Sequence, residues 1–357
     1  MTAKQLAFTY WIVAMVLMVG FGSFGCQFQR QDHGSFRPAQ EWYDTEGNLI
    51  NAHGGGILFY QGTYYWFGEI KSGPTTRVDS VSTWECYRTE AGGVACYSSQ
   101  NLVDWTYLGI ALTPNRNDPK HELHTSKVIE RPKVIYHRKH KVFVMWFHLD
   151  ERDYAYAHAG VAVSDKPMGP YRYLQSYRPN GHESRDFTLF QDEDQRAYLI
   201  YSSDNNQNLR VNLLSQDYLS PTRQETKILI GEKREAPAVF KSDDQYYLLS
   251  SACTGWDPSE TKIAASDSLL GDWKFVDHEL MRPSSKTSFG GQVNFVLPIL
   301  GEEDAFIFMA DIWKKEDLKS SLYMWLPMVR EKECFKVIWE PEWDLDYYMN
   351  ASSTGGR

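Results

Sequence analysis

Cysteine is scarce in this chain, which has 5 cysteines among 357 residues. Apart from Cys26, which ends an N-terminal apolar segment, these are Cys86, Cys96, Cys253 and Cys334. Four cysteines are too few for a disulfide-built scaffold of this length. The sequence also contains no CxxC pair and no Cys/His spacing that indicates a zinc site. A packed hydrophobic core must therefore hold the fold together.

An excess of basic charge is missing as well. Lys and Arg number 37 against 46 for Asp and Glu, which gives a formal net charge of −9. No basic surface is available to neutralise a phosphate backbone, so nucleic acid is not an expected partner. The 42% of hydrophobic and 23% of charged residues are ordinary for a globular protein and exclude wholesale disorder.

Helical periodicity is weak throughout, and residues 314–322 (KKEDLKSSL) predict no more than a short turn. Aromatic residues, by contrast, reach 15% of the chain. Aromatic side chains are enriched in strands, whereas helices favour Ala, Leu, Glu and Lys. This composition favours an all-β protein or a carbohydrate-handling protein over a helical bundle.

One long apolar run follows Lys4 and covers residues 6–25. It ends in Ser-Phe-Gly before Cys26, a pattern similar to a bacterial lipoprotein signal in which Cys26 becomes the lipid-anchored N-terminus. The Leu that usually stands three positions before such a Cys is missing, so an uncleaved membrane anchor or a cleaved secretory peptide also stays open. All three alternatives export the protein. We expect a periplasmic or cell-surface lipoprotein with an export signal in residues 1–26 and a linker in residues 27–44.

A β-rich run, a polar turn and a second β-rich run recur five times, each copy typical of a hairpin. The copies begin about 50 to 77 residues apart, the spacing of four-stranded propeller blades, and cover residues 57–69, 134–148, 189–203, 239–252 and 295–311. A blade must stack on its neighbours, and the last must close on the first. We predict an all-β fold, a single five-bladed β-propeller over residues 45–345 with a tail at 346–357. A β-sandwich is the alternative, but it does not predict five similar hairpins.

Two further expectations follow from this architecture. A closed propeller leaves no sheet edge that requires a partner, so we expect a monomer. Residues 89–95 (TEAGGVA) between Cys86 and Cys96 predict a hairpin tip. The two cysteines could then form a local disulfide in an oxidising compartment, or they could be separate buried thiols.

Polar residues precede all five hairpins, at the start of the innermost strands. They stand at 51–56 (NAHGGG), 130–133 (ERPK), 184–186 (SRD), 234–237 (REAP) and 290–292 (GGQ). Hydrolysis of a glycosidic bond needs one protonated group for the leaving oxygen and another to activate water, and Glu130, Asp186 and Glu235 are of the right type. Crowded carboxylates raise one another's proton affinity, which keeps one of them a usable acid. The alternative is that the neighbouring arginines neutralise them in ion pairs.

The ordered motifs HGGGIL, YYWFGE, ERPKVIY, SRDFTLF, REAPAVF, TGWDP and SFGGQ resemble glycoside hydrolase family 43, in particular its exo-β-1,3-galactanase branch. The resemblance covers about Asn51 to Trp339. It implies a five-bladed propeller and an exo-acting, inverting galactan β-1,3-galactosidase that acts on arabinogalactan-type plant polysaccharide. An α-L-arabinofuranosidase of the same family and a non-catalytic glycan-binding propeller are the alternatives.

The resemblance also implies roles for single residues. Glu235 is the general acid, Glu130 tunes the pKa of that acid and contacts substrate, and Gln292 holds or activates the attacking water, because the Asp base of other members is missing from residues 51–53. We expect Glu235 and Gln292 to face each other across a gap wide enough for one water. The expected substrate contacts are Glu69, Tyr154, Asp186, Asn208, Thr254, Trp256 and His53.

For several of these residues the sequence leaves a second interpretation open. Tyr154 and Trp256 are also explained by core packing. His53 is better explained by fixing the central funnel through hydrogen bonds than by acting as a base, and the three glycines at 54–56 by close backbone approach or positive φ. No cofactor is required. Some family members hold calcium, so a structural calcium is compatible with the resemblance, but no EF-hand-like run of oxygen ligands is present and we expect no catalytic metal.

Overall fold

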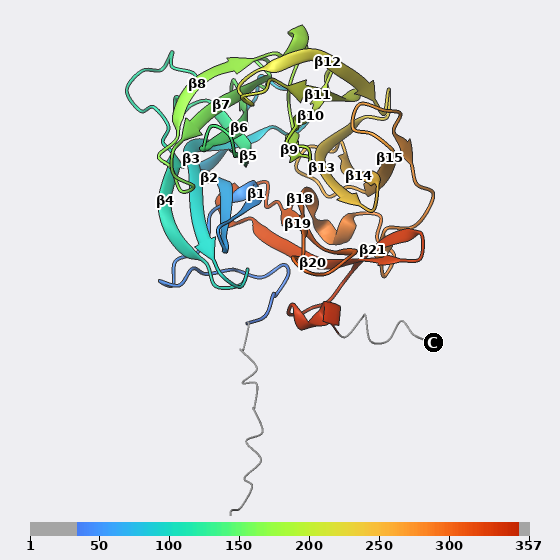
Figure 1. Cartoon of the computed structure of the whole chain (residues 1–357). Helices are drawn as coiled ribbons and strands as arrows, with labels where there is room; N and C mark the ends of the chain where they lie inside the picture. Colours follow the sequence, from blue (N-terminus) through green and yellow to red (C-terminus); the bar gives the residue numbers. More distant parts are fainter. Residues whose placement is uncertain (1–33, 350–357) are drawn as a thin grey trace, which may run out of the picture. The chain divides into compact units, whose positions relative to one another are not determined.

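The structure is a computed structural model that describes residues 34–349. Its strands form five sheets arranged around a central axis, which confirms the five-bladed β-propeller (Figure 1). Blade I contains β1 (His53–Tyr60), β2 (Thr63–Arg77), β3 (Tyr87–Ser99) and β4 (Thr106–Leu112). Blade II contains β5 (Val128–His137), β6 (Val142–Asp150), β7 (His158–Ser164) and β8 (Arg172–Tyr177). Blade III contains β9 (Phe187–Gln191), β10 (Ala197–Ser203), β11 (Asn208–Leu214) and β12 (Pro221–Ile228).

The last two blades complete the ring. Blade IV contains β13 (Arg234–Ser242), β14 (Gln245–Ala252), β15 (Thr261–Ser266) and β16 (Lys274–Phe275). Blade V contains β18 (Gln292–Pro298), β19 (Ala305–Ile312), β20 (Leu322–Glu331) and β21 (Cys334–Ile338), with β17 (Met281–Arg282) added parallel to β21. Three short 3₁₀ turns, η1 (Pro179–Gly181), η2 (Ser288–Gly290) and η3 (Leu318–Ser320), lie in connections. The turn expected in residues 314–322 is η3.

Each predicted hairpin forms the two innermost strands of one blade. In blade I, Tyr60 pairs with Thr63 across the turn residues Gln61 and Gly62, whose φ angles are 49° and 79°. Two positive φ values are typical of the type I′ turn, whose twist matches that of antiparallel strands. The local pattern of apolar runs around a polar turn therefore predicts these hairpins correctly.

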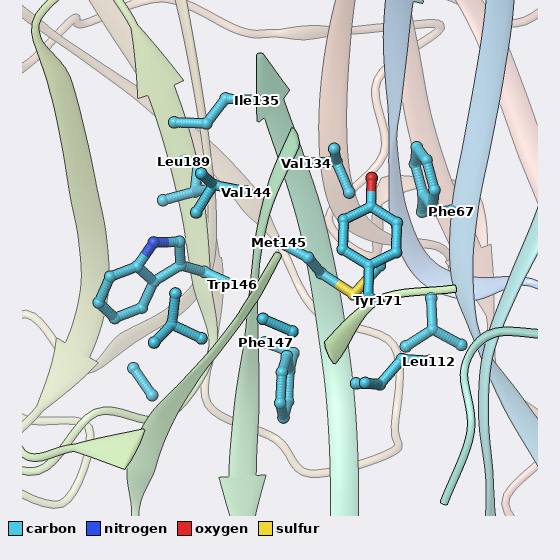
Figure 2. Packing of buried hydrophobic residues seen from close by; sticks show 14 of the residues in the cluster. Phe67, Leu112, Val134, Ile135, Val144, Met145, Trp146, Phe147, Tyr171 and Leu189 are labelled. Atoms are coloured by element: carbon cyan, nitrogen blue, oxygen red, sulfur yellow. The ribbon is translucent and has the colours of Figure 1, made fainter. Parts of the chain in front are cut away.

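The core lies between neighbouring blades. Phe67 of β2, Met145 of β6 and Leu189 of β9 belong to one buried cluster that joins blades I, II and III (Figure 2). Because both faces of a blade are covered, β5 is buried along nearly its whole length instead of alternating. This packing between blades fixes where each innermost strand begins at the axis.

The segment expected to be a linker instead packs on the propeller in its described part, residues 34–44. The Phe36 ring stacks on Trp343 with 4.3 Å between ring centroids, and the Phe36 amide donates to the Trp343 carbonyl at 2.7 Å. The Trp42 ring contacts Trp325 of β20 at 4.9 Å. Apolar side chains in this segment bury themselves against blade V, so the folded unit begins before residue 45.

The C-terminal side behaves in the same way. Tyr348 lies in the predicted tail but is only 2% exposed, and its hydroxyl donates to the Phe306 carbonyl. The folded unit therefore also extends past residue 345. The predicted export signal with Cys26 lies outside the described residues. Within residues 34–349, no helix has the length and apolar character needed to cross a membrane.

The predicted hairpin tip between Cys86 and Cys96 is wrong. Tyr87–Ser99 is one continuous strand, β3, and both thiols are free and buried. Two residues ten positions apart on a strand are separated by about 30 Å, far beyond the reach of a disulfide. The glycines in this stretch serve close packing, because a Cβ on Gly92 would lie 2.5 Å from the Ile70 side chain.

Candidate active site

A cavity of about 520 Å³ lies where the innermost strands begin. All five blades contribute to its walls, and most of the lining side chains are charged, amide-bearing or aromatic. They are Glu69, Thr83, Trp84, Glu130, Arg131, His148, Tyr154, Arg185, Asp186, Asn205, Asn206, Gln207, Glu235, Cys253, Thr254, Trp256, Gln292 and Trp313, together with Gly255. The convergence predicted from the repeats is therefore present.

A shared backbone irregularity places the polar side chains of three blades. The strand register shifts between His53 and Gly56, between Glu130 and Lys133, and between Glu235 and Ala238. The residue after His53, Glu130 or Glu235 has φ near 50°, with values of 58° at Gly54, 54° at Arg131 and 50° at Ala236. Such bulges re-aim side chains at the ends of strands. Here they put Glu130 and Glu235 in the cavity walls.

Only glycine fits the first of these bulges without strain. Gly54 has a positive φ, and a Cβ on Gly55 would lie 1.8 Å from the Phe67 carbonyl oxygen. A Cβ on Gly56 would lie 2.7 Å from the Lys133 side chain. The interpretation of residues 54–56 as close backbone approach is confirmed.

Glu235 is buried at 8% exposure, and each of its carboxylate oxygens has an amide donor. Oε1 accepts from Gln292 Nε2 at 2.9 Å, and Oε2 accepts from Asn206 Nδ2 at 3.1 Å. Burial, and then the negative charge of Asp186, raises the pKa of Glu235 from 4.5 to about 8. A carboxyl group with this pKa is still protonated near neutral pH and can give a proton to a leaving oxygen.

Gln292 touches Glu235 directly, so the expected gap between the two side chains is not present. The Gln292 Oε1 atom accepts hydrogen bonds from Arg131 Nη2 and from Trp313 Nε1, the latter at 2.9 Å. With its oxygen held by two donors, the amide turns its nitrogen toward the Glu235 carboxylate. This arrangement suits Gln292 to position a water or substrate group, and it leaves its oxygen without a free lone pair for a base.

Glu130 lies in a ring of donors on the other side of the cavity. Lys71 Nζ donates to Oε1 at 3.1 Å, and the Tyr154 hydroxyl lies 3.1 Å from Oε1 and 3.2 Å from Oε2. Burial favours the neutral form of Glu130, but Lys71, Arg88 and His148 outweigh it and hold its pKa below the ordinary value. Glu130 is therefore ionised.

Among nearby charges, that of Asp186 contributes most to raising the pKa of Glu235. Asp186 itself accepts from Arg131 Nη2 at 2.8 Å. The charge of Glu130 is compensated locally by Lys71 and Arg88. The expected roles of Glu130, tuning of the acid and contact with substrate, stay predictions.

Glu69 and Lys71 form a second buried pair beside Glu130. Lys71 Nζ lies 3.1 Å from Glu69 Oε1 and also packs over the Trp256 and Trp313 rings at 5.1 and 5.3 Å. Burial, with a further contribution from Glu130, raises the pKa of Glu69 to about 8. Glu69 Oε2 is buried without a hydrogen-bond partner, although Glu69 lines the cavity. This carboxyl group therefore keeps unused hydrogen-bonding capacity next to the cavity.

The remaining predicted contacts divide into two groups. Tyr154, Thr254 and Trp256 line the cavity as expected. Asn208 does not, since its amide nitrogen donates to Asp204 and its oxygen accepts from the Gly231 amide. The tight turn at residues 204–206, where all three φ angles are positive, presents Asn206 instead.

His53 also lies outside the cavity lining. It is fully buried, its ring stacks on Tyr323 at 4.9 Å, and its Nδ1 lies 3.6 Å from Asp311 Oδ1. Neither ring nitrogen has a hydrogen-bond partner. His53 therefore supports the funnel by stacking, and the expectation of substrate contact, or of hydrogen bonds that fix the funnel, is not met.

Sequence reasoning missed several residues of the site. Lys71, Trp84 and Trp313 lie outside the quoted motifs, and no local pattern connects them with the cavity. His148 is the last residue of the second hairpin repeat and shares its strand face with the cavity wall, so its position in the repeat was a usable signal. Among the described residues no group of three His, Cys, Asp or Glu side chains is arranged to hold a metal ion.

The fold and the cavity define a propeller enzyme with a buried carboxylic acid, a paired amide and further carboxylates for a polar substrate. Residues 74–294 match the model of glycosyl hydrolases family 43. The chain belongs to this family, within its exo-β-1,3-galactanase-like branch, and is a glycoside hydrolase. No curated protein matches the sequence.

Solved structures agree with this assignment. The family 43 β-1,3-galactosidase BT0265 is 38% identical with a TM-score of 0.82, over 88% of this chain and 64% of its own length. An exo-β-1,3-galactanase from Phanerochaete chrysosporium, solved with β-1,3-galactotriose, is 36% identical with a TM-score of 0.77, over 87% of this chain and 68% of its own. The exo-β-1,3-galactanase from Clostridium thermocellum is 32% identical with a TM-score of 0.75, over 86% of this chain and 66% of its own.

Proposed function

We propose that the protein is an exo-acting β-1,3-galactosidase that removes galactose from the ends of β-1,3-galactan, the backbone of arabinogalactan-type polysaccharide, with inversion. The observation that carries the proposal is the buried Glu235, whose raised pKa suits a general acid, in contact with Gln292 rather than with a second carboxylate. The similarity to β-1,3-galactosidases and exo-β-1,3-galactanases supports the choice of sugar.

The cavity supports a division of roles. Glu69, Glu130 and Tyr154 bind the hydroxyls of the terminal galactose, and Lys71 holds the two carboxyl groups in place. Glu235 gives its proton to the glycosidic oxygen as the bond to the anomeric carbon breaks. Entry of the sugar breaks the Gln292–Glu235 hydrogen bond, and Gln292, still held by Arg131 and Trp313, positions the attacking water on the opposite face.

The test is product analysis on β-1,3-galactobiose and β-1,3-galactotriose with the purified protein. We expect galactose, and proton NMR of the first product should show the α anomer, because inversion of a β linkage gives the opposite anomer. Glu235→Gln should slow release by about 10²-fold or more, whereas the matched surface variant Glu193→Gln, whose carboxylate is 83% exposed, should not. Release of arabinose but not galactose from arabinogalactan would instead identify an α-L-arabinofuranosidase, and binding without turnover a glycan-binding propeller.

A further inference from the structure

Blade I carries an extension that contributes residues to the cavity wall. Strand β2 continues to Arg77 and β3 begins at Tyr87, well beyond the part of the hairpin that pairs with β1. The residues between these strands include Thr83 and Trp84, which both line the cavity. We refer to residues 70–90 as the blade I extension.

Trp84 spans the cavity between blades that are not neighbours. Its ring lies 5.5 Å from the ring of Tyr154, which follows the second strand of blade II. On its other side, a Cβ placed on Gly255 of blade IV would lie 2.9 Å from Trp84 Cε3, so the indole is packed on the Gly255 backbone. The indole therefore forms a continuous wall from blade II to blade IV.

Polar contacts with three blades hold the extension in place. Lys315 of blade V donates to Glu85 at 2.6 Å and to Asp257 of blade IV at 3.0 Å. Thr75 accepts from the Leu318 amide at 2.9 Å, and Thr76 accepts from Arg152 of blade II at 2.8 Å. Exposed pairs of this kind add little stability singly. Together they fix the position of Trp84, which is a geometric and not an energetic role.

The opposite side of the cavity differs in character. Blade III contributes Arg185 and the turn residues Asn205, Asn206 and Gln207, all polar. Asn206 donates to Glu235, so the proton-donating carboxyl lies beside this polar wall. Glu69, Glu130 and Tyr154, which bind the hydroxyls in the proposed function, lie beside the Trp84 wall. With the roles of the proposed function, this placement directs the leaving sugar toward blade III and the remote hydroxyls of the terminal sugar toward Trp84.

We propose that Trp84, held by the Lys315 contacts, is the specificity-determining residue that restricts the enzyme to chain ends. This inference rests on the proposed function. A galactan chain that continued from O3 of the bound galactose would meet the indole, whereas a free hydroxyl at O3 fits beneath it.

The test compares β-1,3-galactotriose with the same trisaccharide methylated at O3 of its non-reducing galactose. The wild type should cleave the capped substrate on the order of 100-fold more slowly in kcat/KM, the size of effect that one extra carbon produces in a tight pocket. Trp84→Ala should lower the ratio of kcat/KM for the uncapped substrate to kcat/KM for the capped substrate by at least about 10-fold. Trp84→Phe should keep most of it.

Lys315 provides an independent arm because it lies at the surface. Lys315→Ala should lower the ratio of kcat/KM for the uncapped to the capped substrate, as Trp84→Ala does. Lys315→Arg should restore the wild-type ratio. Tyr107→Ala is the matched control, an exposed aromatic on the outer strand of the same blade. Thermal unfolding of each variant shows whether it is folded. If Trp84→Ala does not fold, the result for Lys315→Ala alone tests the proposal.

The outcomes separate the two proposals. If the wild type does not release galactose from the uncapped trisaccharide, the proposed function fails and this inference with it. If it does, and the ratio of the kcat/KM values in folded Trp84→Ala or Lys315→Ala equals that of the wild type, the proposed role of Trp84 is refuted while the proposed function stands. A ratio that stays constant while KM for both substrates rises also refutes it, because Trp84 would then contact the leaving sugar.

Discussion

At the scale of single residues, the cavity separates two buried carboxyl groups by their surroundings. Glu130 is held ionised by Lys71 and Arg88, whereas Glu235 has amide donors and a neighbouring negative charge from Asp186. Opposite pKa shifts in one cavity assign different roles to chemically equal groups. In the proposed function the proton donor is Glu235, which has amide hydrogen-bond donors where Glu130 has cations.

Removal of this proton donor should affect substrates according to their leaving groups. We expect Glu235→Gln to lower kcat for β-1,3-galactobiose by about 10² to 10⁴-fold, the usual contribution of a general acid. The kcat for a nitrophenyl β-galactoside should fall much less, because its leaving group needs little protonation. Steady-state kinetics on both substrates checks this. Equal losses on both would contradict the assignment of Glu235 as the acid.

Asp186 should set the alkaline limit of activity. Its charge raises the pKa of Glu235, and it also accepts from Arg131 Nη2. Asp186→Asn removes a negative charge and leaves Arg131 less neutralised, and both changes lower the pKa of Glu235. The alkaline limb of kcat/KM, expected near pH 8 in the wild type, should therefore move to lower pH. Glu130→Gln is the comparison, and a larger shift of the alkaline limb in that variant would identify Glu130 as the main tuning residue.

The same pKa has a consequence for stability. Glu235 has a pKa of about 8 in the folded chain against 4.5 for the free group, so between these values the folded chain keeps a proton that the unfolded chain has lost. The free energy of unfolding therefore falls as pH rises through this range. Glu235→Gln should be more stable than the wild type at pH 9, by several degrees in Tm, with little difference at pH 4.5. Thermal unfolding at both pH values checks this.

The place of a residue in the cavity was predictable where a motif and a repeat position coincided, as for Glu130, Glu235 and Gln292. They were not predictable where the turn length decides which side chain faces the cavity. Asn208 was expected in the wall, but three successive residues with positive φ at 204–206 present Asn206 instead. The contact between Gln292 and Glu235 depends on Arg131 and Trp313 from two other blades, and no local pattern contains it.

At the scale of elements, the bulge at the start of an innermost strand is the unit that makes the site. It occurs in blades I, II and IV with the same positive φ one residue after His53, Glu130 and Glu235. The hairpins were predictable because their pattern is local. The blade I extension was not, since the paired glycines at 92 and 93, which follow it, suggest a turn, whereas they lie within β3, where a Cβ on Gly92 would clash with Ile70.

Gly55 should be the least replaceable residue of the first bulge. Its Cβ would meet a backbone carbonyl at 1.8 Å, which no side-chain movement relieves. We expect Gly55→Ala to destabilise the chain by about 3 kcal/mol or more, at or above the upper end for overpacking. Gly47→Ala is the control, because that site has nothing within 4 Å and only its positive φ opposes the substitution. Denaturant unfolding of both variants provides the comparison.

At the scale of the whole molecule, aromatic contacts between the two ends of the described chain close the ring. Phe36 is 1% exposed, and its ring contacts Trp343 and Trp325 of blade V. Phe36→Ala should therefore lower the free energy of unfolding by about 3 to 5 kcal/mol, as expected for a buried phenylalanine. Tyr43→Ala, at a site that is 51% exposed, should lower the free energy of unfolding far less. KM of the folded Phe36 variant should equal that of the wild type, and a changed KM would contradict a purely structural role.

The number of blades was predictable from the sequence, because each blade repeats its own hairpin. The ends of the folded unit were not, since residues 34–44 and 346–349 carry no repeat and their burial depends on non-local partners, Trp343 for Phe36 and Phe306, 42 positions away, for Tyr348. Trp42, Phe36 and Tyr348 are apolar enough to be core residues, but composition alone does not say against which blade they pack.

The contact between Phe36 and Trp343 also dictates an order of events during synthesis. Phe36 meets Trp325 and Trp343 only after blade V has been made, so this contact cannot form while the first four blades emerge from the ribosome. Blades I to IV can each form their hairpins in turn, but the cavity, which needs Gln292 and Trp313, is completed only when these residues have been made.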